Sequence, residues 1–180
     1  MLRDEKKAGT SLGLEAHQLT SQGKLLPDSV INDLVKNWLG DHHDSFVFDG
    51  FPRSVGQAEA LEGFLSEQKA SLDLALLLEV NKQTILDRVE RRVMCSQCGS
   101  IFSVGLHIVA QEAGCPKCGG QLAKRSDDNV ETVEARLVEY AEKTEPVIAF
   151  YEQRGLLKRV DASLEPKVVF RSIEQILEAA

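Results

Sequence analysis

The four cysteines of this 180-residue chain lie in two pairs, and their spacing limits what the middle of the chain can fold into. Cys95 and Cys98 form one Cys-x2-Cys pair, Cys115 and Cys118 form the other, and sixteen residues separate the two pairs. Four thiolates at this spacing can close a tetrahedral zinc site, with each pair delivered by a tight turn. We therefore predict a structural Zn2+ ion. A catalytic metal is not expected, because four cysteine ligands leave no coordination position open.

Two disulfides in a secreted protein are the alternative interpretation of these cysteines. Residues 1–7 are charged and contain no signal-peptide core, and no apolar run approaches the roughly 20 residues of a membrane span. These features favour a cytoplasmic protein, in which thiols stay reduced. His107 lies between the cysteine pairs, and we interpret it as a solvated loop residue rather than a ligand.

A second informative motif is Asp-Gly-Phe-Pro-Arg at residues 49–53, directly after the apolar run Phe-Val-Phe at 46–48. The apolar run predicts a short buried strand. The motif then places a carboxylate, a glycine turn and an arginine at the end of that strand. Open α/β sheets bind their ligands at the carboxyl ends of the strands. The motif therefore indicates chemistry on phosphate and magnesium at this edge of a sheet.

Helical and extended patterns alternate along the rest of the chain. Apolar residues at helical spacing predict helices over residues 28–39, 54–65, 82–92, 130–154 and 168–177. The fourth helix is expected to kink near Pro146. Apolar runs predict strands over 74–80 and 156–160, the first of them buried on both faces. The alternation predicts an α/β fold, a parallel sheet flanked by helices, with the cysteine segment inserted between two of those helices.

Arginines gather around these landmarks, although the chain is acidic overall with a net charge of -7. The acidic balance argues against a partner that is a nucleic acid or a membrane surface. Planar guanidinium groups offset negative charge, which is what phosphoryl transfer asks of a protein. For any single arginine a solvated surface charge is the alternative, and for Asp127 and Asp128 helix capping is the default interpretation. The arginines in question are Arg53, Arg88, Arg91, Arg92, Arg125 and Arg136.

Together these motifs resemble those of the bacterial adenylate kinases of the long-lid, zinc-containing type. Besides the four cysteines, the resemblance is carried by Met-Leu-Arg at 1–3, Gly-Lys-Leu-Leu-Pro-Asp at 23–28, the 49–53 motif with Gln57, and the segment 125–137. It covers essentially the whole chain. It implies a P-loop nucleoside monophosphate kinase-like fold and reversible phosphoryl transfer from MgATP to AMP, giving two ADP.

The resemblance also implies roles for individual residues. Arg3 and Arg53 would hold the AMP phosphate, and Gln57 would read the adenine edge. The AMP-binding set it implies is Arg3, Lys24, Leu25, Leu26, Gly50, Phe51, Pro52, Arg53, Gln57, Arg125 and Arg136. The ATP-binding set is Arg88, Arg91, Arg92, Ile101 and Phe102, and the catalytic set is Arg88, Arg125, Arg136 and Asp49.

Two details of that assignment concern the metal and one arginine. Asp49 would hold Mg2+ through water, since Mg2+ usually keeps several of its waters. Glu90 stands where the family has a glycine, and two residues rather than one separate Arg92 from Cys95. Arg91 and Arg92 therefore stay open alternatives as the ATP contact.

The domain organisation implied by the resemblance is a core over 1–92, with AMP-binding helices at about 1–40, a zinc-binding lid over 93–125, and the rest of the core over 126–180. Closure of the lid would exclude water, so that the terminal phosphoryl group of ATP is transferred to AMP rather than to water. The family resemblance also implies a monomer.

The N-terminal region departs from the family pattern. The family begins with an apolar strand and a phosphate loop, Gly-x-Pro-Gly-x-Gly-Lys-Gly-Thr, yet Gly-x4-Gly-Lys-[Ser/Thr] occurs nowhere in these 180 residues. We interpret Met1 as an internal methionine of a longer enzyme, with roughly thirty residues of the pattern missing. The strands near Phe46 and Ala75 are then expected to flank a gap, and the chain alone to be catalytically impaired.

Alternative functions follow from this departure. The chain could be a nucleotide-binding pseudoenzyme or an inactive fragment, because the AMP-side residues are present while the phosphate loop is not. Another nucleoside monophosphate kinase, acting on UMP or CMP, is a further alternative, but Gln57 and the zinc lid favour AMP. A zinc ribbon that binds nucleic acid is disfavoured, because no Lys or Arg lies between Cys98 and Cys115.

Overall fold

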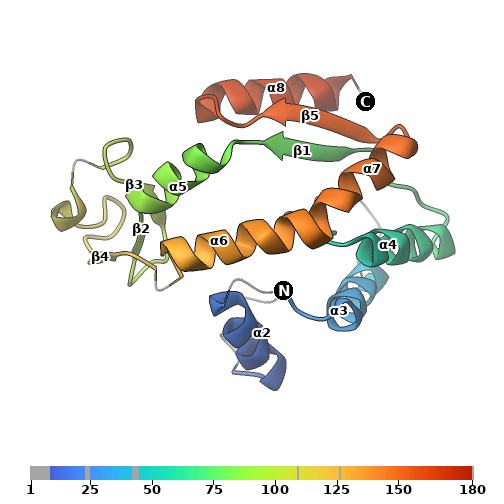
Figure 1. Ribbon diagram of the computed structural model, residues 1–180, viewed down its shortest axis with the longest axis horizontal. Helices are drawn as coiled ribbons and strands as arrows, with labels where there is room; N and C mark the ends of the chain where they lie inside the picture. The colour runs from blue at the N-terminus through green and yellow to red at the C-terminus, as the bar shows by residue number, and fades with distance from the viewer. Residues whose placement is uncertain (1–8, 23–24, 42–44, 109, 126, 180) are drawn as a thin grey trace.

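The computed structural model describes residues 9–22, 25–41, 45–108, 110–125 and 127–179 (Figure 1). Its elements follow in the order α2 (Ser11–Ser21), α3 (Asp28–Asp41), α4 (Val55–Glu67), β1 (Ala75–Glu79), α5 (Lys82–Arg91), β2 (Arg92–Cys95), β3 (Ile101–Ser103), the 3-10 helix η1 (Gln111–Ala113), β4 (Leu122–Ala123), α6 (Val130–Glu139), the π-helix η2 (Tyr140–Thr144), α7 (Glu145–Gln153), β5 (Leu157–Asp161) and α8 (Pro166–Glu178). None of the helices in these ranges is both long and apolar enough to span a bilayer.

The larger body is built on a parallel pair of strands, β1 and β5. Ala75 aligns with Leu157 at one end of the pair and Glu79 with Asp161 at the other. The strands lie between α8 on one side and the consecutive helices α6 and α7 on the other, as Figure 1 shows. Two separate stretches of the chain thus meet in one sheet, and the predicted α/β fold with a parallel sheet is confirmed.

β1 is less buried than its sequence predicts. A parallel strand covered on both faces should bury every side chain, but Leu78 is 50% exposed and Glu79 is also exposed. The prediction of burial on both faces is therefore wrong for the described part of the chain. The physical reason is that β5 is the one described strand that pairs with β1, so no described strand lies along the other edge of β1.

The predicted strand over residues 46–48 is not formed. These residues are described as an irregular segment, and Val47 is 93% exposed. Phe46 and Phe48 instead pack their rings edge-on against Trp38 of α3, with centroid separations of 6.0 and 5.6 Å. A strand needs a neighbour to accept its ladder hydrogen bonds, and no described strand pairs here, so aromatic packing onto the helices decides the conformation.

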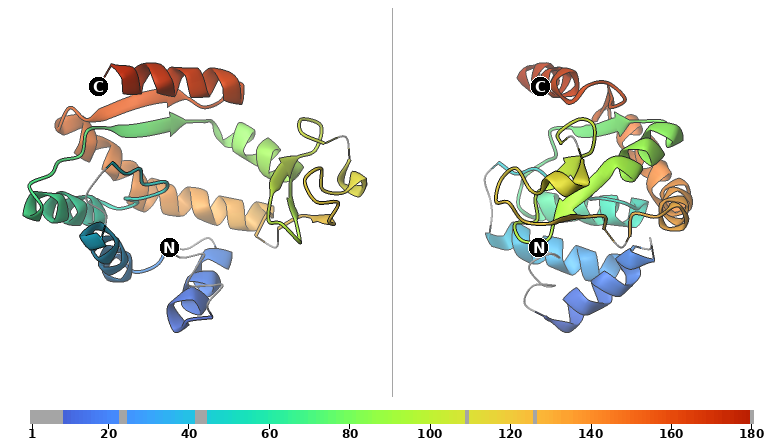
Figure 2. Two further views of the ribbon diagram at one scale, coloured as in Figure 1. Left: turned by 180° about the vertical axis from the view of Figure 1, so that it is seen from behind. Right: turned by 90° about the vertical axis from the view of Figure 1, so that its left-hand side faces the viewer.

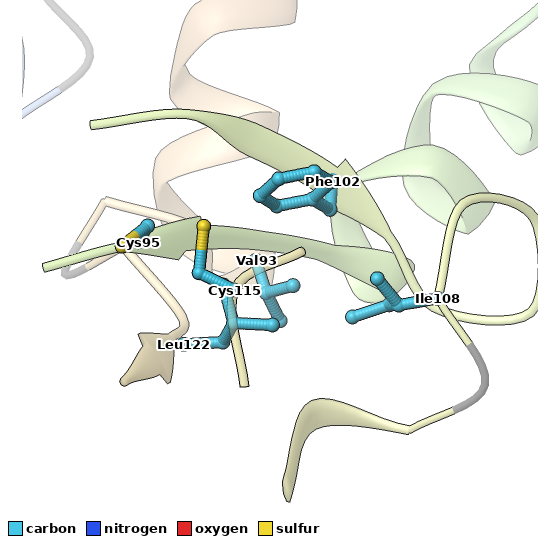
Figure 3. Close-up of a cluster of buried hydrophobic side chains, with 6 residues drawn as sticks. All are labelled: Val93, Cys95, Phe102, Ile108, Cys115 and Leu122. Atoms are coloured by element: carbon cyan, nitrogen blue, oxygen red, sulfur yellow. The ribbon is translucent and has the colours of Figure 1, made fainter. Parts of the chain in front are cut away.

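The cysteine segment folds into a small unit of its own. β2 pairs with β3 and with β4, both antiparallel, in the order β3-β2-β4. Figure 2 shows this sheet at one end of the molecule, beyond the ends of α5 and α6. Its core comes entirely from residues within the segment, as Figure 3 shows: Val93, Cys95, Phe102, Ile108, Cys115 and Leu122.

The predicted helix over 130–154 is interrupted near Pro146, as expected, but the interruption has a specific form. α6 passes into one π-helical stretch, η2, before α7 begins. Pro146 lies in the first turn of α7, directly after the π-helical stretch. A π-helical turn inside an α-helix often marks a functional position, and this one places Thr144 against the 49–53 loop.

Candidate functional site

The N-terminal ends of α3 and α4 are joined by a compact hydrogen-bond network. Ser54 caps α4 by accepting from the Gln57 backbone N–H at 3.1 Å, and its hydroxyl donates to Oδ2 of Asp28 at 2.5 Å. The Gln57 side chain donates from Nε2 to Oδ1 of Asp28 at 2.8 Å. Its Oε1 accepts from the Arg53 backbone N–H at 2.7 Å. Gln57 is only 3% exposed, while Asp28 and Ser54 are half-buried.

The 49–53 loop is shaped by Gly50 and Arg53. The Arg53 side chain folds back and donates from Nε to the Gly50 carbonyl at 2.6 Å. Gly50 has φ +75°, which favours glycine, and a Cβ there would lie 2.6 Å from Arg53 Nη2, so the Arg53 side chain would have to shift. Thr144 of η2 donates to the Arg53 carbonyl at 2.9 Å. The Arg53 and Asp49 side chains are exposed at this loop.

Asp127 draws two of the predicted arginines together. Its Oδ2 accepts from Arg125 at 2.9 Å and from Arg136 at 2.6 Å, and its Oδ1 accepts from Arg125 Nε at 3.0 Å. Burial opposes ionisation of this carboxyl, but the hydrogen bonds from Arg136 and Arg125 outweigh it and hold the pKa of Asp127 below its usual value. Two guanidinium groups are therefore held side by side where the cysteine segment meets α6.

Asp128 forms the second carboxylate–arginine pair, with Arg92. Arg92 Nε donates to Oδ2 of Asp128 at 2.8 Å, and its Nη2 donates to Oδ1. The Asp128 side chain is completely buried, and its hydrogen bonds raise the pKa of the Arg92 guanidinium against the opposing effect of burial. The capping interpretation of both aspartates is thus wrong, because Asn129 caps α6 by accepting from the Thr132 N–H at 2.8 Å.

Arg91 and Arg92, the two alternatives for the ATP contact, have different surroundings in the structure. Arg92 is committed to Asp128, whereas Arg91 is exposed and lines a shallow hollow on the cysteine segment together with Lys124. Arg88, one turn earlier on α5, donates to the Ala162 carbonyl after β5 at 2.7 Å. Arg88 is thereby tied to the carboxyl-terminal end of the parallel sheet.

The four cysteines come together as predicted. The Sγ atoms of Cys95 and Cys118 are 3.5 Å apart, those of Cys98 and Cys115 are 3.6 Å apart, and all four lie within 4.8 Å of one another. A tetrahedron with Zn–S bonds of 2.3 Å has edges of about 3.8 Å, so this donor set fits zinc. All four are free thiols, and the alternative of two disulfides is not what the structure shows.

The four sulfurs also influence one another's pKa values. Hydrogen bonds from Ser100 lower the pKa of Cys98 to about 6. The Gly120 N–H favours a Cys118 thiolate, but the neighbouring sulfurs outweigh it and raise the pKa of Cys118 to about 12. A metal cation among the four sulfurs would favour the thiolate form of each of them. His107 lies apart from the cluster and accepts from the Ser103 N–H at 3.1 Å.

The remaining predicted residues are distributed as follows. Ile101 is 49% exposed on the cysteine segment, whereas Phe102 is buried in its core. Leu26 is buried and Leu25 half-buried just before α3. Arg3 and Lys24 lie outside the described residues. The sequence did not indicate which residues hydrogen-bond to the predicted site residues. These partners come from other elements of the fold, or have a local role such as helix capping as their default interpretation; they are Asp28, Ser54, Asp127, Asp128 and Thr144.

Comparison with known proteins decides the family. A family model described as "Adenylate kinase" matches residues 1–156 of the chain. The chain belongs to the adenylate kinase family. The adenylate kinase of Thermodesulfovibrio yellowstonii is 42% identical over 180 residues, a match that covers 99% of this chain and 84% of the relative. That of Syntrophobacter fumaroxidans is 42% identical over 179 residues, covering 98% of this chain and 84% of the relative.

A third relative, the adenylate kinase of Geobacillus sp. strain WCH70, is 38% identical over 179 residues, covering 98% of this chain and 83% of that protein. The predicted family resemblance is therefore confirmed over nearly the whole chain. By family the protein is a phosphotransferase. Adenylate kinases act on ATP, AMP and ADP and use Mg2+ with ATP, so the family implies these as substrates and cofactor.

Proposed function

We propose that this protein transfers a phosphoryl group reversibly from MgATP to AMP, and that the described residues divide into an AMP side and a phosphate side. The observation that carries the proposal is the arginine pair on Asp127. Arg125 and Arg136 are held together by one carboxylate, which is the arrangement of positive charge that a phosphoryl group needs. When a nucleotide binds, its phosphate would replace the Asp127 carboxylate as the negative group that Arg125 and Arg136 contact.

The AMP side lies on the loop and the two helix starts around Gln57. Gly50, Phe51, Pro52 and Arg53 would surround the phosphate and sugar, with Leu25 and Leu26 lining the pocket. The exposed guanidinium of Arg53 is free to leave the Gly50 carbonyl for a phosphate, because that neutral contact is weaker than a charge-assisted one. Arg3 and Lys24 complete the proposed set by resemblance.

The phosphate side is formed by arginines on both sides of the cysteine segment. We assign Arg91, rather than Arg92, as the ATP contact, because Arg92 already pairs with a buried carboxylate while Arg91 is exposed. Arg88 would act with Arg125 and Arg136 on the transferring group. Ile101 provides an exposed apolar surface for the ATP base, whereas Phe102 supports it from the core. Asp49 would hold Mg2+ through water.

Residues 93–125 are proposed to act as a lid over this site, between core regions at 1–92 and 126–180. The segment has its own buried core, and Zn2+ on the four cysteines would stabilise it without taking part in the reaction. The Arg92–Asp128 pair joins the residue leading into the segment to a residue just after it. The two connections to the core are therefore tied to each other, which suits a unit that moves as one body.

A second candidate is nucleotide binding without turnover. It is favoured by the groups on the AMP side, because Arg53, Gln57 and Asp28 are joined by hydrogen bonds among the described residues. The groups proposed for AMP belong to this network, so AMP binding is expected in both cases.

One experiment separates these functions. ADP formation from ATP and AMP would be measured for the zinc-loaded 180-residue chain with Mg2+, beside AMP binding by calorimetry. Turnover supports the proposed kinase, and AMP binding without turnover supports the second candidate. Absence of both would refute the AMP site as assigned. A preference for UMP or CMP in the same assay would indicate a different nucleoside monophosphate kinase.

A further inference from the structure

The side-chain amide of Gln57 is held from two sides by groups of opposite hydrogen-bonding character. Its Oε1 accepts from the Arg53 backbone N–H at 2.7 Å, and its Nε2 donates to Oδ1 of Asp28 at 2.8 Å. A backbone N–H can only donate, and an ionised carboxylate can only accept. The amide therefore fits one way round. Turned over, it would set donor against donor at Arg53 and acceptor against acceptor at Asp28.

The Asp28 carboxylate is itself held in place. Its second oxygen, Oδ2, accepts from the Ser54 hydroxyl at 2.5 Å. A Cβ built on Gly56 would lie 3.3 Å from that same oxygen, so the carboxylate sits tightly against the start of α4. Both oxygens of Asp28 are thus engaged, and the group that orients Gln57 has little room to turn.

We propose that Asp28 is a positioning residue for base selectivity, which fixes the Gln57 amide so that the site accepts a 6-aminopurine and rejects a 6-oxopurine. The inference rests on the proposed function, in which Gln57 contacts the base of AMP. With the amide fixed, one Nε2 hydrogen and one Oε1 lone pair remain for a ligand. Adenine presents the complementary pair, an amino donor beside a ring-nitrogen acceptor. A 6-oxopurine places a carbonyl acceptor where adenine has its amino donor.

The burial of Gln57 makes this orientation decisive. The residue is 3% exposed, so water is poorly placed to satisfy an amide atom that faces the wrong base. A buried polar group left without a partner costs far more than a typical hydrogen bond contributes. Sites built to hydrogen-bond a substrate group discriminate strongly for this reason. A freely turning amide would lose that discrimination, because it could match either base by rotating.

The test compares the affinities of the zinc-loaded 180-residue chain for AMP and IMP (inosine 5′-monophosphate), measured by calorimetry. The wild-type chain is expected to prefer AMP. Asp28→Ala should narrow the ratio of the two affinities at least tenfold, which corresponds to about 1.4 kcal/mol. Asp28→Asn keeps the size of the side chain but can present either an oxygen or an N–H to Gln57. Its AMP-to-IMP affinity ratio is expected to lie between those of the wild type and Asp28→Ala, and it replaces Asp28→Ala in the test if that variant does not fold.

A matched control separates selectivity from stability. Asn81 caps α5 by accepting from the Thr84 N–H at 2.8 Å and has no part in the Gln57 network. Asn81→Ala should lower the melting temperature, as the loss of the Asp28 network does, but should leave the AMP-to-IMP ratio unchanged.

The outcomes are distinguishable. If the wild-type chain binds neither nucleotide, the proposed AMP site fails and the inference fails with it. If the wild type prefers AMP and both Asp28 variants keep that ratio while binding more weakly, the AMP site stands and Asp28 has a structural role only. A ratio that also narrows in Asn81→Ala would show that selectivity follows stability, and that too would overturn the inference.

Discussion

Replacing Arg92 by alanine should destabilise the protein strongly, whereas the same change at Arg91 should not. Arg92 makes two charge-assisted hydrogen bonds to Asp128, whose side chain is completely buried. Removing the arginine leaves a carboxylate inside the protein without a counter-charge. Breaking one partner of a buried pair typically costs about 3–5 kcal/mol. Because the Arg92 side chain is itself 28% exposed, water can enter, and we expect the lower end, about 3 kcal/mol.

The measurement is thermal unfolding followed by circular dichroism on the zinc-loaded chain. For a domain of this size, about 1 kcal/mol shifts the melting temperature by roughly 2–4 °C, so Arg92→Ala should lower it by roughly 6–12 °C. Arg91→Ala is the matched control, because the neighbouring arginine is exposed. It should shift stability by less than about 0.5 kcal/mol. Arg92→Lys should fall between them, because an ammonium keeps the charge but not the two-pronged geometry.

The same pair of variants tests the functional assignment. If Arg91 is the ATP contact, Arg91→Ala should weaken ATP binding at unchanged stability. Arg92→Ala should lower the stability and leave ATP binding by the folded protein unchanged. Equal and small losses of stability in both variants would refute the reasoning, because the Arg92–Asp128 pair would then contribute nothing that a surface charge does not. A loss of ATP affinity confined to Arg92→Ala would reverse the assignment of the two arginines.

Three further predictions concern the metal, a carboxylate and a glycine. Cys98→Ser should abolish stoichiometric zinc, measured by plasma mass spectrometry, and raise amide hydrogen exchange across residues 93–123 while α3 and α4 stay protected, because the segment has its own core. The lowered pKa of Asp127 contributes stability that is fully present above the ordinary pKa of 3.8 and is lost as the pH falls through the lower pKa of the folded state. Urea unfolding measured at a series of pH values from about 2 to 6 should show this loss of stability in the wild type and a smaller loss in Asp127→Asn. Gly50→Ala should cost about 1–2 kcal/mol from its positive φ and displace the Arg53 side chain, so AMP binding should weaken more than at Gly63→Ala, where added carbon meets open space.

Local signals in the sequence were sufficient for most helices and for the cluster of four cysteines. The cap at Ser54, the apolar spacing on α3 and the paired cysteines each act within a few residues, so their consequences can be worked out without knowing the fold. The start of α5 and the strand at β5 follow from equally local patterns. Even the interruption before α7 was signalled by Pro146, although the sequence did not indicate that it takes the form of a π-helical turn.

Features that depend on distant neighbours could not be predicted in this way. The apolar run at 46–48 has the composition of a buried strand, but a strand exists only if another strand accepts its hydrogen bonds, and here its phenylalanines pack on Trp38 instead. β1 is half-exposed for the same reason. Asp127 and Asp128 follow each other in the sequence and look alike as helix caps, yet one gathers Arg125 and Arg136 while the other is buried against Arg92.

The sequence by itself therefore determined the family and the clustering of the four cysteines, because these rest on residue type and spacing. The tertiary structure alone decided which of the predicted site residues are free to act. Arg91 is left exposed by its place on α5, while Arg92 is neutralised by a carboxylate 36 positions later. Gln57 is turned by Asp28, 29 positions earlier. Hydrogen bonds and ion pairs between such distant positions depend on how the elements pack, and packing is not a property of any short stretch of sequence.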